Sequence, residues 1–166
     1  MRKLHFISLL LFGCLGLLGC PYESQVPISH PTIPVDARLL GNWSCKDESY
    51  NSYTVTKASS NEYHIVQHNI SNTSRYKGHL SEVKGAMFMN LFSDSTKAYY
   101  LYKVKMDSAG SRFTLIPISE KLSDHFGSVD GLRNYVEKNM NFQSFYSEQD
   151  KLEYEKQEGS KPTALN

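Results

Sequence analysis

The feature that most constrains the fold is a series of short strand-like segments between residues 39 and 118, with no helical segment between them. Polar turns that contain Gly, Asn or Ser separate these segments. The predicted strands span residues 39–45, 52–57, 62–68, 74–83, 86–92, 97–106 and 112–118. A spacing of roughly 10 to 15 residues without crossover helices favours an antiparallel meander over parallel units.

The predicted strand 97–106 shows the clearest alternation. Its apolar positions are Tyr100, Tyr102, Val104 and Met106. Lys103 and Lys105 occupy the opposite face. Such a strand is typical of a sheet that places one face on the core and the other in water.

One helix is predicted late in the chain, over residues 128–140. Ser128 can cap its N-terminus, and Asp130 is favourable in its first turn. The apolar residues at three- and four-residue steps are Leu132, Tyr135, Val136 and Met140. This single stripe predicts a helix that packs one side against the strands.

After the helix, residues 142–147 and 151–157 are predicted to form a final hairpin. An open meander would leave two exposed edges, and closing it into a barrel removes them. The sequence therefore predicts a mainly β domain over residues 37–157, an antiparallel up-and-down barrel of about eight strands with one helix. In this barrel the strand 151–157 pairs with the strand 39–45. The alternative is a β-sandwich, in which those two strands belong to different sheets.

The triplet Gly41-Asn42-Trp43 on the first predicted strand, followed by this meander, resembles the lipocalin family. The chain also resembles the small lipocalin-like lipoproteins of bacterial envelopes. The resemblance implies a lipocalin-like barrel in which Trp43 packs across one end and Gly41 lets the first strand bend. We therefore expect Gly41 and Trp43 to be structural residues and not ligand contacts.

Residues 1–19 have the order of a secretory signal peptide. Arg2 and Lys3 precede an apolar run over residues 4–18, which is roughly 15 residues long and shorter than the ~20 needed to span a bilayer. Pro21 would stop a helix just beyond this run. The alternative is an uncleaved membrane anchor.

The end of this run, Leu17-Leu18-Gly19-Cys20, resembles the lipobox of bacterial lipoproteins. The resemblance implies cleavage before Cys20, a diacylglycerol on its thiol and a further acyl chain, expected to be palmitate, on the freed amine. Two or three chains anchor a protein to a membrane far more firmly than one. Pro21 stands where aspartate would signal retention in the inner membrane, so we expect the outer membrane, facing the periplasm.

Residues 20–36 contain four prolines, which favour an extended backbone. This segment is predicted to be a tether that stands the domain off the lipid surface. The alternative is an edge strand packed on the domain through Val26, Ile28 and Ile33. At the other end of the chain, the polar residues 158–166 are predicted to be a disordered tail.

The charge of the mature chain excludes one class of partner. Loss of Arg2 and Lys3 with the signal peptide reduces 18 basic residues to 16, against 17 acidic residues, so the net charge is −1. No basic stripe is present, which argues against nucleic acid. Cys45 is the only cysteine left besides Cys20, and we expect it to be a small buried apolar residue.

No residue pattern indicates catalysis. No serine lies in a Gly-x-Ser-x-Gly motif, and no glycine-rich phosphate loop is present. A metal site built from His64, His68 and His79 is the competing interpretation, but no Cys or acidic residue lies at ligand spacing from them. We therefore expect a non-enzymatic protein without a metal or cofactor.

The predicted strands contain more aromatic residues than are needed to fill a hydrophobic core. If Tyr100 and Tyr102 point into a barrel, their hydroxyls need partners or water, which suits a lumen of some polarity. The candidate ligand-binding residues are Tyr53, Tyr100, Tyr102 and Phe113. They predict a barrel that binds a small hydrophobic or amphipathic ligand. The alternative is a barrel filled by these rings that docks an envelope protein partner.

Overall fold

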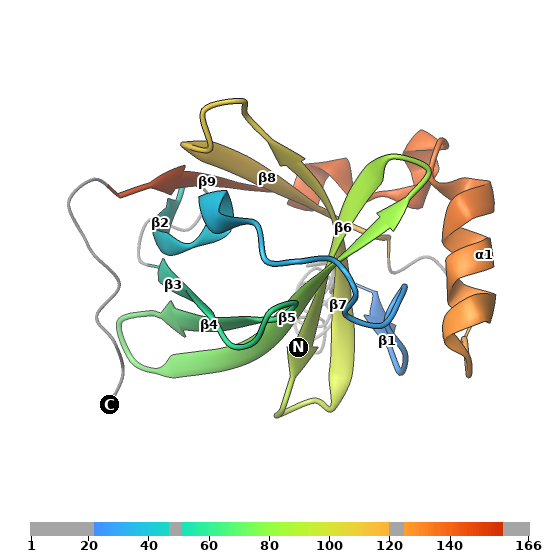
Figure 1. Ribbon diagram of the computed structural model, residues 1–166, viewed down its shortest axis with the longest axis horizontal. Coiled ribbons are helices and arrows are strands. Elements are labelled where there is room, and N and C mark those ends of the chain that lie inside the picture. Colours follow the sequence, from blue (N-terminus) through green and yellow to red (C-terminus); the bar gives the residue numbers. More distant parts are fainter. Residues whose placement is uncertain (1–21, 47–50, 120–124, 158–166) are drawn as a thin grey trace, which may run out of the picture.

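A computed structural model describes residues 22–46, 51–119 and 125–157, and Figure 1 shows their arrangement. The predictions for the signal peptide, for Cys20 and Pro21 and for the tail at 158–166 lie outside the described residues. The strands are β1 (Glu23–Ser24), β2 (Gly41–Cys45), β3 (Ser52–Lys57), β4 (Tyr63–His68), β5 (Thr73–Val83), β6 (Ala86–Ser93), β7 (Ala98–Met106), β8 (Arg112–Pro117) and β9 (Leu152–Lys156). The helices are the α-helix α1 (Val129–Asn139) and the 3-10 helices η1 (Ala37–Leu39), η2 (Gln143–Phe145) and η3 (Glu148–Asp150). No helix in this part of the chain is long and apolar enough to cross a membrane.

Strands β2 to β9 form a closed antiparallel barrel in which each strand pairs with its neighbours in the sequence. The first and last strands close the barrel, because Trp43 of β2 lies opposite Tyr53 of β3 on one side and Lys156 of β9 on the other. The predicted up-and-down barrel is therefore confirmed, and the β-sandwich alternative is wrong. Closure leaves neither β2 nor β9 with an exposed edge.

Alternate side chains of the strands point into the barrel, and we call the buried residues there the inner core. They are Leu39, Trp43, Cys45, Val55, Tyr63, Ile65, Leu80, Met89, Phe113, Leu115 and Tyr154. Cys45 takes its place among them as a small buried side chain.

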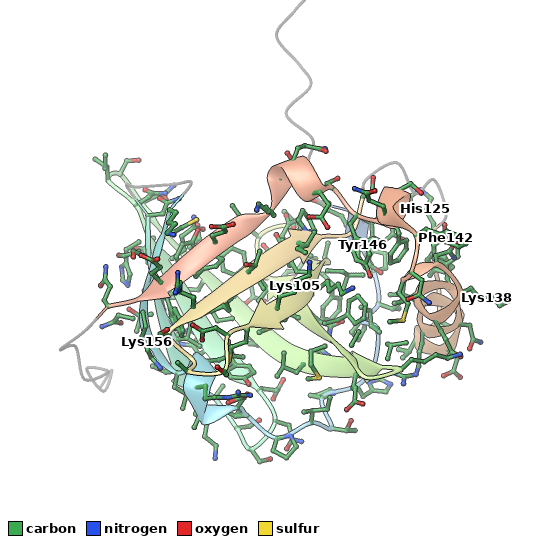
Figure 2. All side chains as sticks on the ribbon, turned by 90° about the horizontal axis from the view of Figure 1, so that it is seen from above. Lys105, His125, Lys138, Phe142, Tyr146 and Lys156 are labelled. Atoms are coloured by element: carbon green, nitrogen blue, oxygen red, sulfur yellow. The ribbon has the colours of Figure 1, made fainter. Side chains whose placement is uncertain are left out.

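The outer face of β5, β6 and β7 carries a second layer, the outer core, which is covered by the N-terminal segment and by α1. Its buried members are Tyr22, Ile28, Val83, Phe88, Leu101, Ile118, Leu132, Val136, Met140 and Phe145. In Figure 1, α1 lies against one side of the barrel. In Figure 2, Lys138 of α1 and Lys156 of β9 lie on opposite sides of the molecule.

Residues 22–35 differ from the predicted tether, because they form a strap that crosses the outside of the barrel toward η1 (Figure 1). Glu23 and Ser24 pair with Tyr100 and Tyr99 of β7 as the short strand β1. Ile28 is fully buried in the outer core. The alternative, a segment packed on the domain, is therefore the one that the structure shows. The free energy gained by burying its apolar side chains outweighs the conformational entropy that a free linker would keep.

Buried hydrogen bonds fix the strap to the barrel. The backbone N–H of Ile28 donates to Asn90 Oδ1 at 2.8 Å, and Asn90 Nδ2 donates to Ser81 Oγ at 2.8 Å. His79 Nε2 lies 2.7 Å from the carbonyl oxygen of Ser29, an acceptor, so this nitrogen carries the proton. Burial lowers the pKa of His79, which favours the neutral ring. Each buried polar group named here thus has a partner, as a dry interface requires.

The helix α1 matches its prediction closely. Ser128 is its N-cap, and the side-chain oxygen accepts from the backbone N–H of Gly131 at 3.2 Å. Leu132 and Val136 are its buried residues and pack into the outer core. An ion pair of 2.9 Å between Glu137 and Lys84 joins the helix to the turn between β5 and β6.

The predicted final hairpin is wrong in its first half. Residues 142–147 form η2 and a single bridge between Tyr146 and Ile118, while β9 pairs with β8 and β2. Phe145 is buried in the outer core, a position that an extended partner of β9 would not reach. Barrel closure decides this difference, because both edges of β9 are already occupied by barrel strands.

One end of the barrel is capped by η1, and we call it the closed end. Trp43 is fully buried there, and its Nε1 donates to the carbonyl oxygen of Leu39 at 2.9 Å. Gly41 has φ +127°, and a Cβ at this position would lie 3.2 Å from Lys156 Cε. Residues with a Cβ rarely adopt this backbone conformation. The absence of a Cβ at Gly41 also leaves room for the Lys156 side chain.

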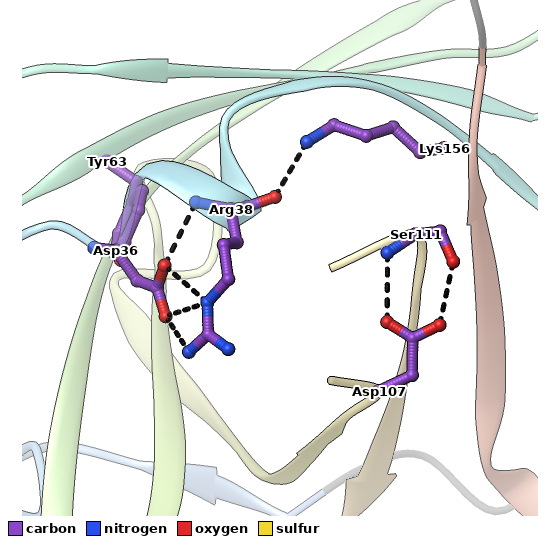
Figure 3. A network of polar contacts seen from close by, with 6 residues as sticks. All are labelled: Asp36, Arg38, Tyr63, Asp107, Ser111 and Lys156. Atoms are coloured by element: carbon purple, nitrogen blue, oxygen red, sulfur yellow. Dashed lines mark hydrogen bonds and ion pairs between the residues drawn. The ribbon is translucent and has the colours of Figure 1, made fainter. Parts of the chain in front are cut away.

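Polar contacts hold the cap in place, as Figure 3 shows. Asp36 forms a bidentate pair with Arg38, with a shortest distance of 2.6 Å, and its backbone N–H donates to the Tyr63 hydroxyl at 2.7 Å. Lys156 Nζ donates to the carbonyl oxygen of Arg38 at 2.9 Å and lies 5.1 Å from the centre of the Trp43 ring. Burial raises the pKa of Tyr63 to about 12, so its hydroxyl stays neutral.

Candidate ligand-binding cavity

The lumen of the barrel contains a cavity of about 320 Å³. It is lined by Glu23, Leu39, Tyr53, Val55, Ile65, Gln67, Tyr76, Met89, Leu91, Tyr100, Tyr102, Phe113, Leu115, Leu152 and Tyr154. The strand residues among them are inward-facing residues of β3 to β9, with Glu23 added by β1 and Leu39 by η1. The aromatic side chains therefore do not fill the barrel.

The burial of the lining residues divides the cavity into a floor and a rim. The floor is formed by the buried residues Leu39, Val55, Ile65, Met89, Phe113, Leu115 and Tyr154. The rim is formed by the more exposed residues Glu23, Tyr53, Gln67, Tyr76, Leu91, Tyr100, Tyr102 and Leu152. The cavity thus has an apolar inner part and opens at the end of the barrel opposite η1.

Phe113 joins the floor of the cavity to the packed closed end. Its ring meets the edge of Trp43 at a centroid distance of 4.6 Å and stacks on Tyr154 at the same distance. Trp43 itself does not line the cavity. These packed rings therefore form the base of the cavity, and the open space lies on the side of Phe113 and Tyr154 away from Trp43.

The rim carries a chain of neutral hydrogen bonds. Gln67 Nε2 donates to the Tyr53 hydroxyl at 3.1 Å, and the Tyr76 hydroxyl donates to Gln67 Oε1 at 3.3 Å. The same residues are neighbours across strands, since Tyr53 lies directly opposite Gln67. Burial also raises the pKa of Tyr154, just below them, well above its usual range. These hydroxyls and the amide give a ligand polar partners at the entrance of an apolar space.

Glu23 is the one charged residue among the described residues that line the cavity. The Tyr100 hydroxyl donates to its Oε1 at 3.0 Å and also lies 3.3 Å from Thr96 Oγ1. Burial raises the pKa of Tyr100, and the contact with Glu23 raises it further. Glu23 is exposed at the rim, where its carboxylate faces both water and the lumen.

All four candidate ligand-binding residues line this cavity. Tyr53 of β3, Tyr100 and Tyr102 of β7 and Phe113 of β8 come together from three strands, with Phe113 on the floor and the tyrosines at the rim. Whether they contact a ligand stays a prediction.

Sequence reasoning missed two polar members of the site. Gln67 had a usable signal, because it shares a face with Tyr63 and Ile65 on its strand. Glu23 had none, because it lies in a strand of two residues within a proline-rich segment.

The histidines do not gather into one site. His64 and His68 alternate with inward-facing residues of β4 and so point outward, and His68 Nε2 lies 3.4 Å from Thr54 Oγ1. His79 is engaged with the strap. Among residues 22–46, 51–119 and 125–157, no three His, Cys, Asp or Glu side chains are grouped as a metal site would need.

Comparisons of this chain with protein-family models, with curated proteins and with solved structures find no match.

Proposed function

We propose that this protein is a lipid-anchored envelope lipoprotein whose lipocalin-like barrel binds a small hydrophobic or amphipathic ligand in its lumen. The observation that carries the proposal is the cavity of about 320 Å³ inside the closed barrel. Ligand pockets of proteins typically measure ~300–1,000 Å³. An engineered apolar cavity of about 150 Å³ holds one benzene molecule, so this lumen suits a ligand of roughly twice that size.

The distribution of polarity supports an amphipathic ligand. The floor is formed by aliphatic side chains and by Phe113 and Tyr154, and the polar groups gather at the rim. A ligand would lower its free energy by burying an apolar part against the floor while its polar end stays near Gln67 and water. The alternative is a filled barrel that acts only by docking a protein partner. It does not account for the open cavity in the lumen.

The lipid anchor rests on the segment Leu17 to Cys20. Cys20 precedes Tyr22, which is buried against the barrel, by only two residues. A lipidated Cys20 would therefore keep the domain close to the membrane, in our proposal the outer membrane on its periplasmic side. Cys20→Ala should release the protein into the soluble fraction or stall its processing, and density-gradient fractionation of the unaltered chain should place it with outer membranes. Normal maturation and membrane association of that variant would contradict the anchor.

Binding can be tested with Nile red, a neutral dye that brightens in apolar sites. The full chain carrying Cys20→Ser, which lacks acyl chains, should bind the dye with saturable brightening. Leu91→Trp places a larger side chain from the rim into the cavity and should weaken dye binding by about tenfold or more.

Ile70→Trp is the matched control, because Ile70 is 83% exposed on the turn between β4 and β5 and does not line the cavity. Its affinity for the dye should equal that of the parent chain. An equal loss in both variants, or brightening that never saturates, would contradict binding in the lumen.

A further inference from the structure

We propose that the cavity selects amphiphiles with a cationic head group, an amine or a quaternary ammonium, and holds that head at the rim between Glu23 and the tyrosines. This inference rests on the proposed binding function and narrows the class of ligand. It follows from three features of the lining: its charge, the position of Glu23 and the kind of ring around it.

The charge of the lining favours cations over anions. Glu23 contributes a carboxylate, and the described lining residues include no Lys, Arg or His that could pair with an anionic head. A fatty acid bound with its tail on the floor would bring its own carboxylate to the rim beside Glu23, where like charges repel. An ammonium at the same place would be attracted.

The backbone and one hydrogen bond hold Glu23 in position. Its strand β1 pairs with β7 so that Glu23 lies directly opposite Tyr100. The Tyr100 hydroxyl donates to Oε1 at 3.0 Å. A carboxylate has two oxygens with about four acceptor positions, so this bond leaves capacity for the N–H donors of an amine or for the charge of a quaternary ammonium. Because Glu23 is exposed, the fold does not remove its carboxylate from water before a ligand binds.

The rings around the rim are of the kind that attracts cations. Tyr53, Tyr76, Tyr100 and Tyr102 all line the cavity there. The face of a tyrosine ring carries partial negative charge and attracts an ammonium within about 6 Å, and aromatic groups recognise methylated ammonium ligands in this way. The hydrogen bonds from Gln67 to Tyr53 and from Tyr76 to Gln67 limit the movement of two of these rings.

The test compares three amphiphiles with the same ten-carbon chain: decyltrimethylammonium, decanol and decanoate. Each displaces Nile red from the full chain carrying Cys20→Ser, at concentrations below those at which it forms micelles. An exposed ion pair together with cation–π contacts corresponds to about tenfold in affinity, so decyltrimethylammonium should bind about tenfold more tightly than decanol. Decanoate should bind most weakly.

Glu23→Gln removes the charge and keeps the shape of the side chain. It should weaken the binding of decyltrimethylammonium by roughly three- to tenfold and leave the affinity for decanol unchanged. Glu137→Gln is the matched control, because it changes the net charge equally on α1, where Glu137 pairs with Lys84 and does not line the cavity. That control should leave all three affinities unchanged.

Several results would overturn the inference. They are equal affinities for the three compounds, tighter binding of decanoate, or the same loss in Glu23→Gln and Glu137→Gln. In each of these cases the lumen still binds amphiphiles, and the proposed function stands. Failure of the chain to bind Nile red and all three compounds would instead overturn the proposed function together with this inference.

Discussion

The inner core and the outer core share the strands β5, β6 and β7 but differ in how completely they are filled. On β7, Tyr102 lines a cavity of about 320 Å³, whereas the adjacent Leu101 is 0% exposed in the outer core. The number and stagger of the strands fix the width of a barrel, so its lumen cannot shrink onto the side chains inside. The part of the strap around Ile28 and the helix α1 lie outside the barrel wall, so their side chains can pack closely onto its outer face.

The inner core is itself uneven along the barrel axis. At the closed end Trp43, Phe113 and Tyr154 pack ring against ring, and toward the rim the packing gives way to open space. The comparison therefore separates three environments: a packed barrel end, a hollow lumen and a dense outer layer. Each makes a different prediction about the cost of removing a side chain.

The largest effect is expected at the closed end. Trp43→Ala removes a fully buried ring and its hydrogen bond to Leu39, and it should lower the free energy of unfolding by ~3–5 kcal/mol. Urea unfolding followed by circular dichroism measures this. Phe142→Ala is the control, because Phe142 is 61% exposed beside α1 (Figure 2), and it should change stability by less than about 0.5 kcal/mol. Similar values for the two variants would show that the closed end is not packed.

The contrast between the lumen and the outer core is tested by the same substitution on adjacent strands. Leu101→Ala empties space in the dense outer core and should cost about 3–4 kcal/mol. Leu91→Ala enlarges a space that is already open and should cost about 1–2 kcal/mol, because Leu91 is only half-buried at the rim. Urea titrations of both variants measure the difference. Equal losses would mean that the lumen is packed as tightly as the outer layer.

The polar contacts beneath the strap should contribute somewhat less. Asn90→Ala leaves the N–H of Ile28 and the hydroxyl of Ser81 without this partner in a buried place, at a cost of about 1–3 kcal/mol. Amide hydrogen exchange should show faster exchange at Ile28. Asn141→Ala, on an exposed residue, should leave both stability and exchange unchanged. Unaltered exchange at Ile28 in the Asn90 variant would contradict the role of this contact.

The smallest effect concerns pH. Burial lowers the pKa of His79 below its ordinary value of about 6.5, so the unfolded chain binds a proton that the folded chain excludes. The stability that depends on the neutral ring is complete above about pH 6.5 and decreases as the pH falls from there toward the folded-state pKa.

The thermal midpoint should therefore fall further between about pH 7.5 and about pH 5.5 in the parent chain than in His79→Gln. The glutamine keeps a donor for the carbonyl of Ser29 and does not titrate. An identical pH dependence of the two proteins would show that His79 is readily protonated in the fold.

The barrel strands could be predicted because their evidence is local. The strand Ser52–Lys57 has the predicted bounds, and the others differ by one or two residues. The alternation of Tyr100 and Tyr102 with Leu101 and Lys103 already indicated which side chains face the lumen, since the two faces of a strand are fixed by its geometry. For the same reason the four aromatic candidates line one cavity.

The strap, the segment 142–147 and Glu23 could not be predicted in this way. Their positions depend on contacts with strands far away in the sequence, such as the bond from Ile28 to Asn90 or the bridge between Tyr146 and Ile118. In a segment without hydrophobic periodicity, the sequence pattern does not indicate which distant residues it will contact. Prolines in the strap indicated an extended backbone, and they gave no information about whether that backbone would dock.

The sequence by itself thus determined the strands, the helix, the need to close the meander and the side chains that would face inward. Only the tertiary structure decided that the lumen stays hollow, that a strap and α1 cover the outer face of β5 to β7, and that the Glu23 carboxylate lies at the rim. The physical reason is range. Alternation and capping act between residues a few positions apart, whereas the volume of a cavity and the charge at its entrance are sums over nine segments that meet only when the barrel closes.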